Sequence, residues 1–165
     1  MRILPVHLAQ AIRALGAMDL ARREHLADEL FARQPNLLAS VLVLHRMGAD
    51  SRDIETALHA LLVSWLAMKA SGASWPVVTE AMQRSCLQHL TARTRFCEGL
   101  RDEQYGQVAQ QYIDDHPEPH LLAFVNAHLQ ENGLRSRRSD SHGQVVLVAL
   151  NLVECIAHAA PRGEP

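Results

Sequence analysis

The chain has 165 residues and a formal net charge of −2 at pH 7, with 48% hydrophobic and 21% charged residues. This length fits one compact domain, and this composition excludes an intrinsically disordered chain. The slightly acidic balance also excludes the global positive field on which non-specific nucleic-acid binding relies.

Apolar residues recur with the helical period along almost the whole chain, which predicts an all-α fold of seven or eight helices. Pro5 can open a first helix that runs toward Gly16, and Asp19 suits the N-cap of a second helix that ends near Gln34. Pro35 can start a third helix, because the first turn of a helix does not need the missing N–H group.

The fourth helix has the clearest signals. Gly48 can end the third helix, and Asp50 or Ser51 can cap the fourth. Its apolar residues follow the spacing of one buried stripe: Ile54, Ala57, Leu58, Leu61, Leu62, Trp65 and Met68. We therefore expect Trp65 to lie in the core.

A long fifth helix and a shorter, more polar sixth helix follow. We expect Ser74 to cap the fifth helix, with Trp75 and Pro76 in its first turn and its end near Glu98. The sixth helix covers about residues 102–113, and two nearby prolines, Pro117 and Pro119, predict a sharp break after it.

The seventh helix runs from Pro119 to about Asn132, and Gly133 is a good residue for its C-terminal cap. Residues 134–143 are rich in Ser and Arg and predict a loop. The last helix, about residues 144–159, is apolar on nearly every face, as expected for a central or interfacial helix. We predict a single domain over residues 1–160 and a frayed tail over residues 161–165.

One pattern occurs twice in the sequence. Residues 35–41 (PNLLASV) resemble residues 119–125 (PHLLAFV), and residues 62–70 resemble residues 152–160 in the same order. The pattern suggests a duplicated three-helix unit joined by the fifth helix. Because Leu, Ala and Val are abundant throughout, similar composition without duplication explains it equally well.

A group of potential metal ligands lies between the sixth and seventh helices. Asp115, His116, Glu118 and His120 offer carboxylate and imidazole groups within six residues. Their spacing matches no established metal motif, and the two prolines fix directions that need not converge. We therefore favour a polar loop next to a helix cap and predict no bound metal.

Other histidines and acidic residues have simpler interpretations. Glu55 and His59, and likewise Glu154 and His158, are four residues apart on predicted helices, which favours surface ion pairs. His89 and His128 lie beside apolar stripes, where a histidine is usually a hydrogen-bonded part of the core.

No pattern predicts a known reaction or cofactor. The sequence contains no Gly-x-Ser-x-Gly motif and no glycine-rich phosphate loop. The basic residues Arg135, Arg137 and Arg138 could contact phosphate, but Asp53 and Glu55 would repel DNA from the one helix that could read it. We do not expect nucleic-acid binding, and we predict no cofactor.

The cysteines and the length of the apolar runs bear on where the protein resides. Cys86, Cys97 and Cys155 match no metal or redox spacing, which favours free thiols in a reducing compartment. No run approaches the 18 or so apolar residues of a membrane span. We expect a cytoplasmic protein, and the preference for Arg over Lys favours a bacterial source.

These observations together favour a non-enzymatic helical module that binds a protein partner or itself. The last helix carries more apolar surface than one neighbour can cover, so we expect a symmetric homodimer with Val146 and Val153 in the interface. The alternative is a metal-dependent or small-molecule-binding helical protein that uses the region of His116 to His120.

Overall fold

A computed structural model of the chain describes residues 1–135 and 140–159, and the predicted all-α fold is confirmed. No strand occurs in these ranges, and none of their helices is long and apolar enough to cross a membrane. The elements are α1 (Pro5–Gly16), α2 (Leu20–Arg33), α3 (Pro35–Leu42), a 3₁₀ turn (Val43–His45), α4 (Ser51–Ala70), α5 (Glu80–Glu98), α6 (Asp102–Asp115), α7 (Pro119–Glu131) and α8 (Asp140–His158).

The predicted capping residues determine most helix boundaries. Asp19 and Asp50 occupy N-cap positions, where their carboxylates accept hydrogen bonds from the main-chain N–H groups of Arg22 and Asp53. Gly133 has a φ of +75°, the left-handed conformation that a side chain would strain, and it follows the end of α7.

Two helix starts differ from the prediction. Helix α5 begins after Thr79 rather than Ser74, and residues 73–79 form no helix, because Pro76 disfavours a helical conformation in the residue before it. Helix α8 begins at Asp140, so it includes residues 140–143 of the predicted loop. Residues 136–139 of that loop, which include Arg137 and Arg138, and the predicted tail lie outside the described residues.

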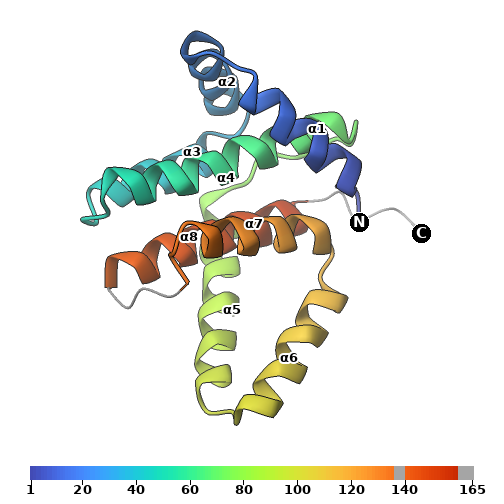
Figure 1. Cartoon of the computed structure of the whole chain (residues 1–165), viewed down its shortest axis with the longest axis vertical. Coiled ribbons are helices and arrows are strands. Elements are labelled where there is room, and N and C mark those ends of the chain that lie inside the picture. The colour runs from blue at the N-terminus through green and yellow to red at the C-terminus, as the bar shows by residue number, and fades with distance from the viewer. Residues whose placement is uncertain (136–139, 160–165) are drawn as a thin grey trace.

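The fold contains two similarly arranged halves, α1–α4 and α5–α8, and Figure 1 shows them one above the other. Helix α1 packs on α4 as α5 packs on α8, and α4 and α8 lie against each other at the centre. Each half therefore has four helices rather than the predicted three. The repeated sequence pattern begins α3 and α7 in equivalent positions.

A buried side chain precedes each of the prolines that start α3 and α7, Pro35 and Pro119. Each of these side chains binds the segment that begins the opposite half. The Gln34 side chain accepts a hydrogen bond from the Val78 N–H group at 2.9 Å and donates one to the Pro76 carbonyl, just before α5. The Glu118 carboxylate accepts from the N–H groups of Arg2 and Ile3 at 3.0 Å each, just before α1. Gln34 and Glu118 are both almost fully buried, so the two contacts are equivalent and reciprocal.

Helix α8 is central, which corrects the location proposed for the dimer interface. It contacts α3, α4, α5 and α7, and Val153 is only 1% exposed. Val146 is half-buried and packs against the same core. The apolar residues on several faces of α8 therefore cover neighbouring helices of the same chain, and Val153 is not accessible to a second copy.

The burial of Trp65 in α4 is confirmed, and it predicts a large effect on stability. We expect Trp65→Ala to lower the free energy of unfolding by about 3–5 kcal/mol, because the substitution leaves a cavity in the core. Phe31→Ala is the control, since Phe31 is exposed and its loss should change the free energy by no more than about 0.5 kcal/mol. Urea unfolding followed by circular dichroism measures both. A loss below about 1 kcal/mol for Trp65→Ala would contradict its core position.

Candidate functional site

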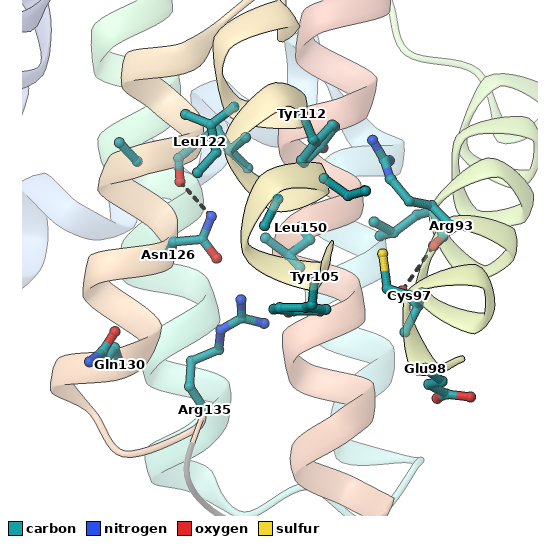
Figure 2. A pocket seen from close by; sticks show the side chains of 16 residues that line it. Arg93, Cys97, Glu98, Tyr105, Tyr112, Leu122, Asn126, Gln130, Arg135 and Leu150 are labelled. Carbon is teal, nitrogen blue, oxygen red and sulfur yellow. Dashed lines mark hydrogen bonds between the residues drawn. The ribbon is translucent and has the colours of Figure 1, made fainter. Parts of the chain in front are cut away.

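The first feature of the site is a cavity of about 440 Å³ between α5 and α6 on one side and α7 and α8 on the other. We call it the apolar cavity, and Figure 2 shows its lining. Five residues of α6 line it with the spacing of one helix face: Tyr105, Val108, Ala109, Tyr112 and Ile113. Leu122 of α7 and Leu150 of α8 face them from the body of the protein.

Charged and amide side chains also line the apolar cavity: Arg93, Glu98, Asn126, Gln130 and Arg135. The Asn126 side chain donates to the Leu122 carbonyl at 3.1 Å, and its buried Oδ1 atom accepts no hydrogen bond from the described residues. Arg93 and Arg135 contribute the two positive charges of the lining, from opposite sides in Figure 2. A molecule bound here would meet mainly apolar atoms, together with polar groups that include the Asn126 Oδ1 acceptor.

A second cavity, of about 500 Å³, lies next to the first. We call it the polar cavity, because most of the side chains that line it can form hydrogen bonds: Cys86, His89, Arg93, Tyr112, Asp115, His116, Pro117, Glu154 and His158. Arg93 and Tyr112 line both cavities. The Arg93 guanidinium stacks on the Tyr112 ring at 3.7 Å from its centroid, so this pair forms the wall that the two cavities share.

Glu154 of α8 is the centre of the polar cavity. Its Oε1 atom accepts hydrogen bonds from Arg93 at 2.9 Å and from the Tyr112 hydroxyl. Its Oε2 atom lies 3.8 Å from Nδ1 of His158, but Glu154 is buried rather than at the surface as the sequence pattern suggested. A buried carboxylate is costly unless it is paired, and Arg93 and Tyr112 provide that compensation.

The Tyr112 hydroxyl remains protonated over the physiological range. Burial raises the pKa of Tyr112 strongly, and the hydrogen bond to Glu154 and the negative charge of that carboxylate raise it further. Tyr112 therefore acts as a hydrogen-bond donor to Glu154. The phenolate form would place a second negative charge beside the first.

His116 presents a buried donor to the polar cavity. Its Nδ1 atom accepts a hydrogen bond from the Glu118 N–H group at 3.0 Å, so in the neutral ring the proton is on Nε2. That Nε2 atom has no hydrogen-bond partner among the described residues, and the nearest Glu154 oxygen is 3.9 Å away. Burial lowers the pKa of His116, although the Glu154 charge opposes this effect.

The four candidate metal ligands from the sequence do not share one site. Asp115 is exposed, Glu118 binds the chain before α1, and His120 lies half-buried on α7. Only His116 and Asp115 line the polar cavity. Their proximity in sequence does not give a common direction, because Pro117 and Pro119 separate the end of α6 from the start of α7.

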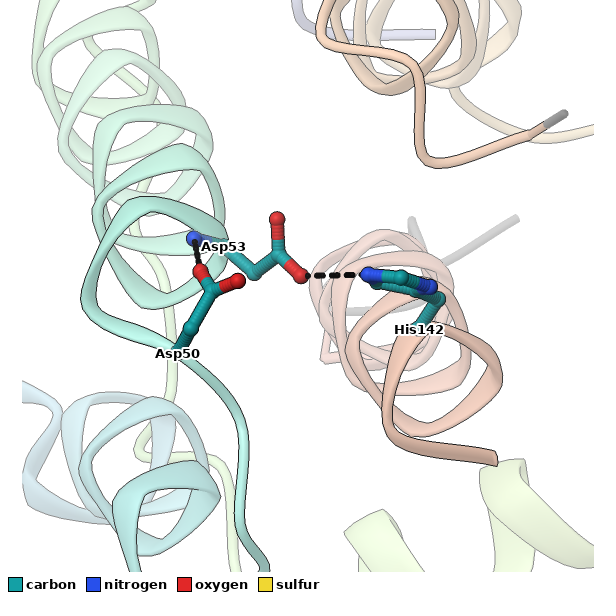
Figure 3. Close-up of side chains that lie close together, drawn as sticks. All are labelled: Asp50, Asp53 and His142. Carbon is teal, nitrogen blue, oxygen red and sulfur yellow. Dashed lines mark hydrogen bonds and ion pairs between the residues drawn. The ribbon is translucent and has the colours of Figure 1, made fainter. Parts of the chain in front are cut away.

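Within the described ranges, one group has the spacing needed for a metal: Asp50, Asp53 and His142, whose ligand atoms lie within 4.8 Å of one another (Figure 3). Asp50 already caps α4, and Asp53 pairs with His142 of α8 at 3.0 Å. These contacts connect the beginnings of α4 and α8. The three side chains therefore have a structural role that accounts for their proximity.

Two buried cysteines near the site are poor nucleophiles. The thiols of Cys86 on α5 and Cys155 on α8 interact, and burial raises the pKa of both. A thiol reacts as its thiolate, so a raised pKa suppresses attack at neutral pH. The interaction therefore adds to the packing of α5 on α8.

Sequence reasoning missed Glu154, Arg93 and Tyr112 as a group. The Glu154–His158 spacing was visible, but spacing within one helix does not reveal which other helices cover it. The face of α6 gave a usable signal, since residues 105, 108, 109, 112 and 113 follow an amphipathic pattern.

The lowered pKa values predict that stability falls in mild acid. Burial lowers the pKa of His116 and of His59, so the unfolded chain binds more protons between each folded pKa and the ordinary value near 6.5. The free energy of unfolding should therefore decrease as pH falls through this interval, by at most about 1.4 kcal/mol per pH unit for each histidine. Urea unfolding at about pH 7 and pH 5 measures the change.

His116→Gln isolates one contribution to this dependence, since glutamine cannot take up the proton. We expect the free energy of unfolding of this variant to decrease less between the two pH values than that of the wild type. The control, His25→Gln, changes an exposed histidine and should keep the full dependence. An unchanged dependence in His116→Gln would show that His116 is not held neutral by burial.

Comparison of this chain with protein-family models, with curated proteins and with solved structures found no match. No relative therefore assigns a role to either cavity. The function has to be inferred from the geometry of the site and the chemistry of its residues.

Proposed function

We propose that this protein binds a small, mainly apolar molecule in the apolar cavity. The proposal rests on how little of the apolar face of α6 is buried. Five residues of its apolar face line the cavity, although α6 also packs on α7, and none of its described side chains is fully buried. In the other half, the corresponding helix α2 buries Leu26 and Leu30 in the core. An amphipathic helix gains stability by removing its apolar face from water, and a bound molecule would supply that contact.

The dimensions and lining of the cavity favour a small molecule over a partner helix. A volume of about 440 Å³ lies within the range typical of small-molecule sites, which are mostly apolar with a few polar groups that orient the ligand. The free Oδ1 acceptor of Asn126 favours a ligand with one N–H or O–H group.

A neutral fluorescent probe tests this proposal. N-phenyl-1-naphthylamine is apolar, carries one N–H group and brightens in apolar surroundings. We expect it to bind the protein, and we expect Ala109→Trp to weaken binding by at least about tenfold, because the indole would fill the cavity from α6.

The control for this experiment is Ala92→Trp. Ala92 is exposed on α5 and does not line the cavity, so its substitution should leave probe binding unchanged. Circular dichroism verifies that both variants remain helical. Equal binding by the wild type and Ala109→Trp would place the probe elsewhere and refute the proposal.

A second candidate function, self-association, rests on a different surface. Leu42, Val43 and Met47 lie within six residues at the end of α3 and are 53%, 41% and 44% exposed. Single exposed apolar residues are normal, but three together favour an interface. The predicted homodimer would then form through this turn rather than through Val146 and Val153.

Sedimentation velocity at micromolar concentration tests self-association. We expect a dimer that Val43→Glu converts to a folded monomer, because the new charge would be buried without a partner in the interface. Val153→Glu should instead unfold the chain, since Val153 lies in the core. A wild-type monomer would rule out this second candidate.

A further inference from the structure

Helix α6 and the second half of α5 project from the rest of the protein. No described side chain between residues 91 and 115 is fully buried, and Figure 1 shows both helices running away from the centre to the turn that joins them. Only residues 99–101 connect the two helices, yet α6 packs mainly on α7 and makes few contacts with α5. A segment with few buried contacts opens at a lower cost in free energy than the core. Helix α6 can therefore move without unfolding the rest of the chain.

Tyr112 provides the polar contacts that hold α6 against α5 and α8. Its hydroxyl donates a hydrogen bond to Glu154 of α8, and the Arg93 guanidinium of α5 stacks on its ring at 3.7 Å from the centroid. Arg93 also donates to the same carboxylate at 2.9 Å, so three helices meet at these three side chains. No other described side chain of α6 forms a hydrogen bond or an ion pair with α5 or α8.

The first half of the chain shows how a helix in this position is fixed. Helix α2 packs on both α3 and α4, and it buries Leu26 and Leu30. Helix α6 packs on α7, but its contacts with α8 are few apart from those of Tyr112. It therefore has less to lose on opening than α2 has, and Tyr112 contributes much of what holds it.

The place of Tyr112 connects this motion to the cavities. Tyr112 lies near the C-terminal end of α6, and Tyr105, at the other end, is 49% exposed. Both residues line the apolar cavity, and Tyr112 with Arg93 also forms the wall toward the polar cavity. We propose that α6 is a movable lid over the apolar cavity, and that Tyr112 is the latch that holds this lid to Glu154.

Hydrogen exchange measured by NMR tests the lid in the protein without any ligand. After correction for intrinsic rates, we expect the amides of residues 106–113 in α6 to exchange at least about tenfold faster than those of residues 24–31 in α2. Low concentrations of urea should change the α6 rates little, because opening of one helix exposes little surface. The slowest amides of α4 should instead respond steeply to urea, since they exchange through global unfolding.

Tyr112→Phe tests the latch, because it removes the hydroxyl and keeps the ring that stacks on Arg93. We expect the α6 amides to exchange at least about threefold faster in this variant, with α2 unchanged. The control is Tyr105→Phe, which makes the same change at an exposed residue of the same cavity and should leave the α6 rates unaltered. Exchange of α6 as slow as that of α2, or equal effects of the two substitutions, would overturn the proposal.

The consequence for ligand entry rests on the proposed function. In stopped-flow measurements with N-phenyl-1-naphthylamine, Tyr112→Phe should raise both the association and the dissociation rate constants by at least about threefold and leave Kd within about twofold. A lid changes how often the cavity is open, whereas a simple lining contact changes dissociation alone, and that second result would speak against the lid. If the wild type does not bind the probe, the proposed function fails, and hydrogen exchange still decides whether α6 opens.

Discussion

The arrangement of the two halves depends on the buried side chains of Gln34 and Glu118. Each residue precedes the proline that starts a helix, and each binds main-chain groups of the segment that begins the opposite half. Unpaired main-chain groups are costly to bury, so these contacts allow extended segments to lie against the core. The reciprocal exchange places α1 on α4 and α5 on α8, with α4 and α8 side by side. Both cavities lie around α8, and their positions follow from this arrangement.

The same arrangement of helices has two different outcomes in the two halves. In the first half, α2 places Leu26 and Leu30 in the core, and Arg23 donates a hydrogen bond to the Leu15 carbonyl of α1. In the second half, α6 contacts mainly α7, and its apolar face lines the apolar cavity. None of the described side chains of α6 is fully buried, whereas α2 buries two leucines. A repeated architecture therefore provides one half whose helices close over the core and one half that contains both cavities.

Glu154 shows how a costly residue can be retained in such a core. A buried ion pair contributes little net stability, because desolvation offsets most of the attraction. Arg93 and Tyr112 compensate the carboxylate, yet the same two side chains form the wall between the cavities. His116 completes the group without hydrogen-bonding to the carboxylate. A paired buried charge therefore lies next to a buried donor that has no hydrogen-bond partner among the described residues.

The helices follow from local sequence, because apolar periodicity and capping act within a few residues. Asp19, Pro35, Asp50 and Pro119 mark real boundaries, and the stripe through Trp65 is the buried face of α4. Which side chains contact one another depends instead on how the helices pack. The ligands near His116 diverge although they are neighbours in sequence, and Val153 is covered by helices of its own chain. Glu154, Arg93 and Tyr112 come together from α8, α5 and α6. Such contacts depend on helix packing across long separations in the chain, and local sequence patterns do not specify them.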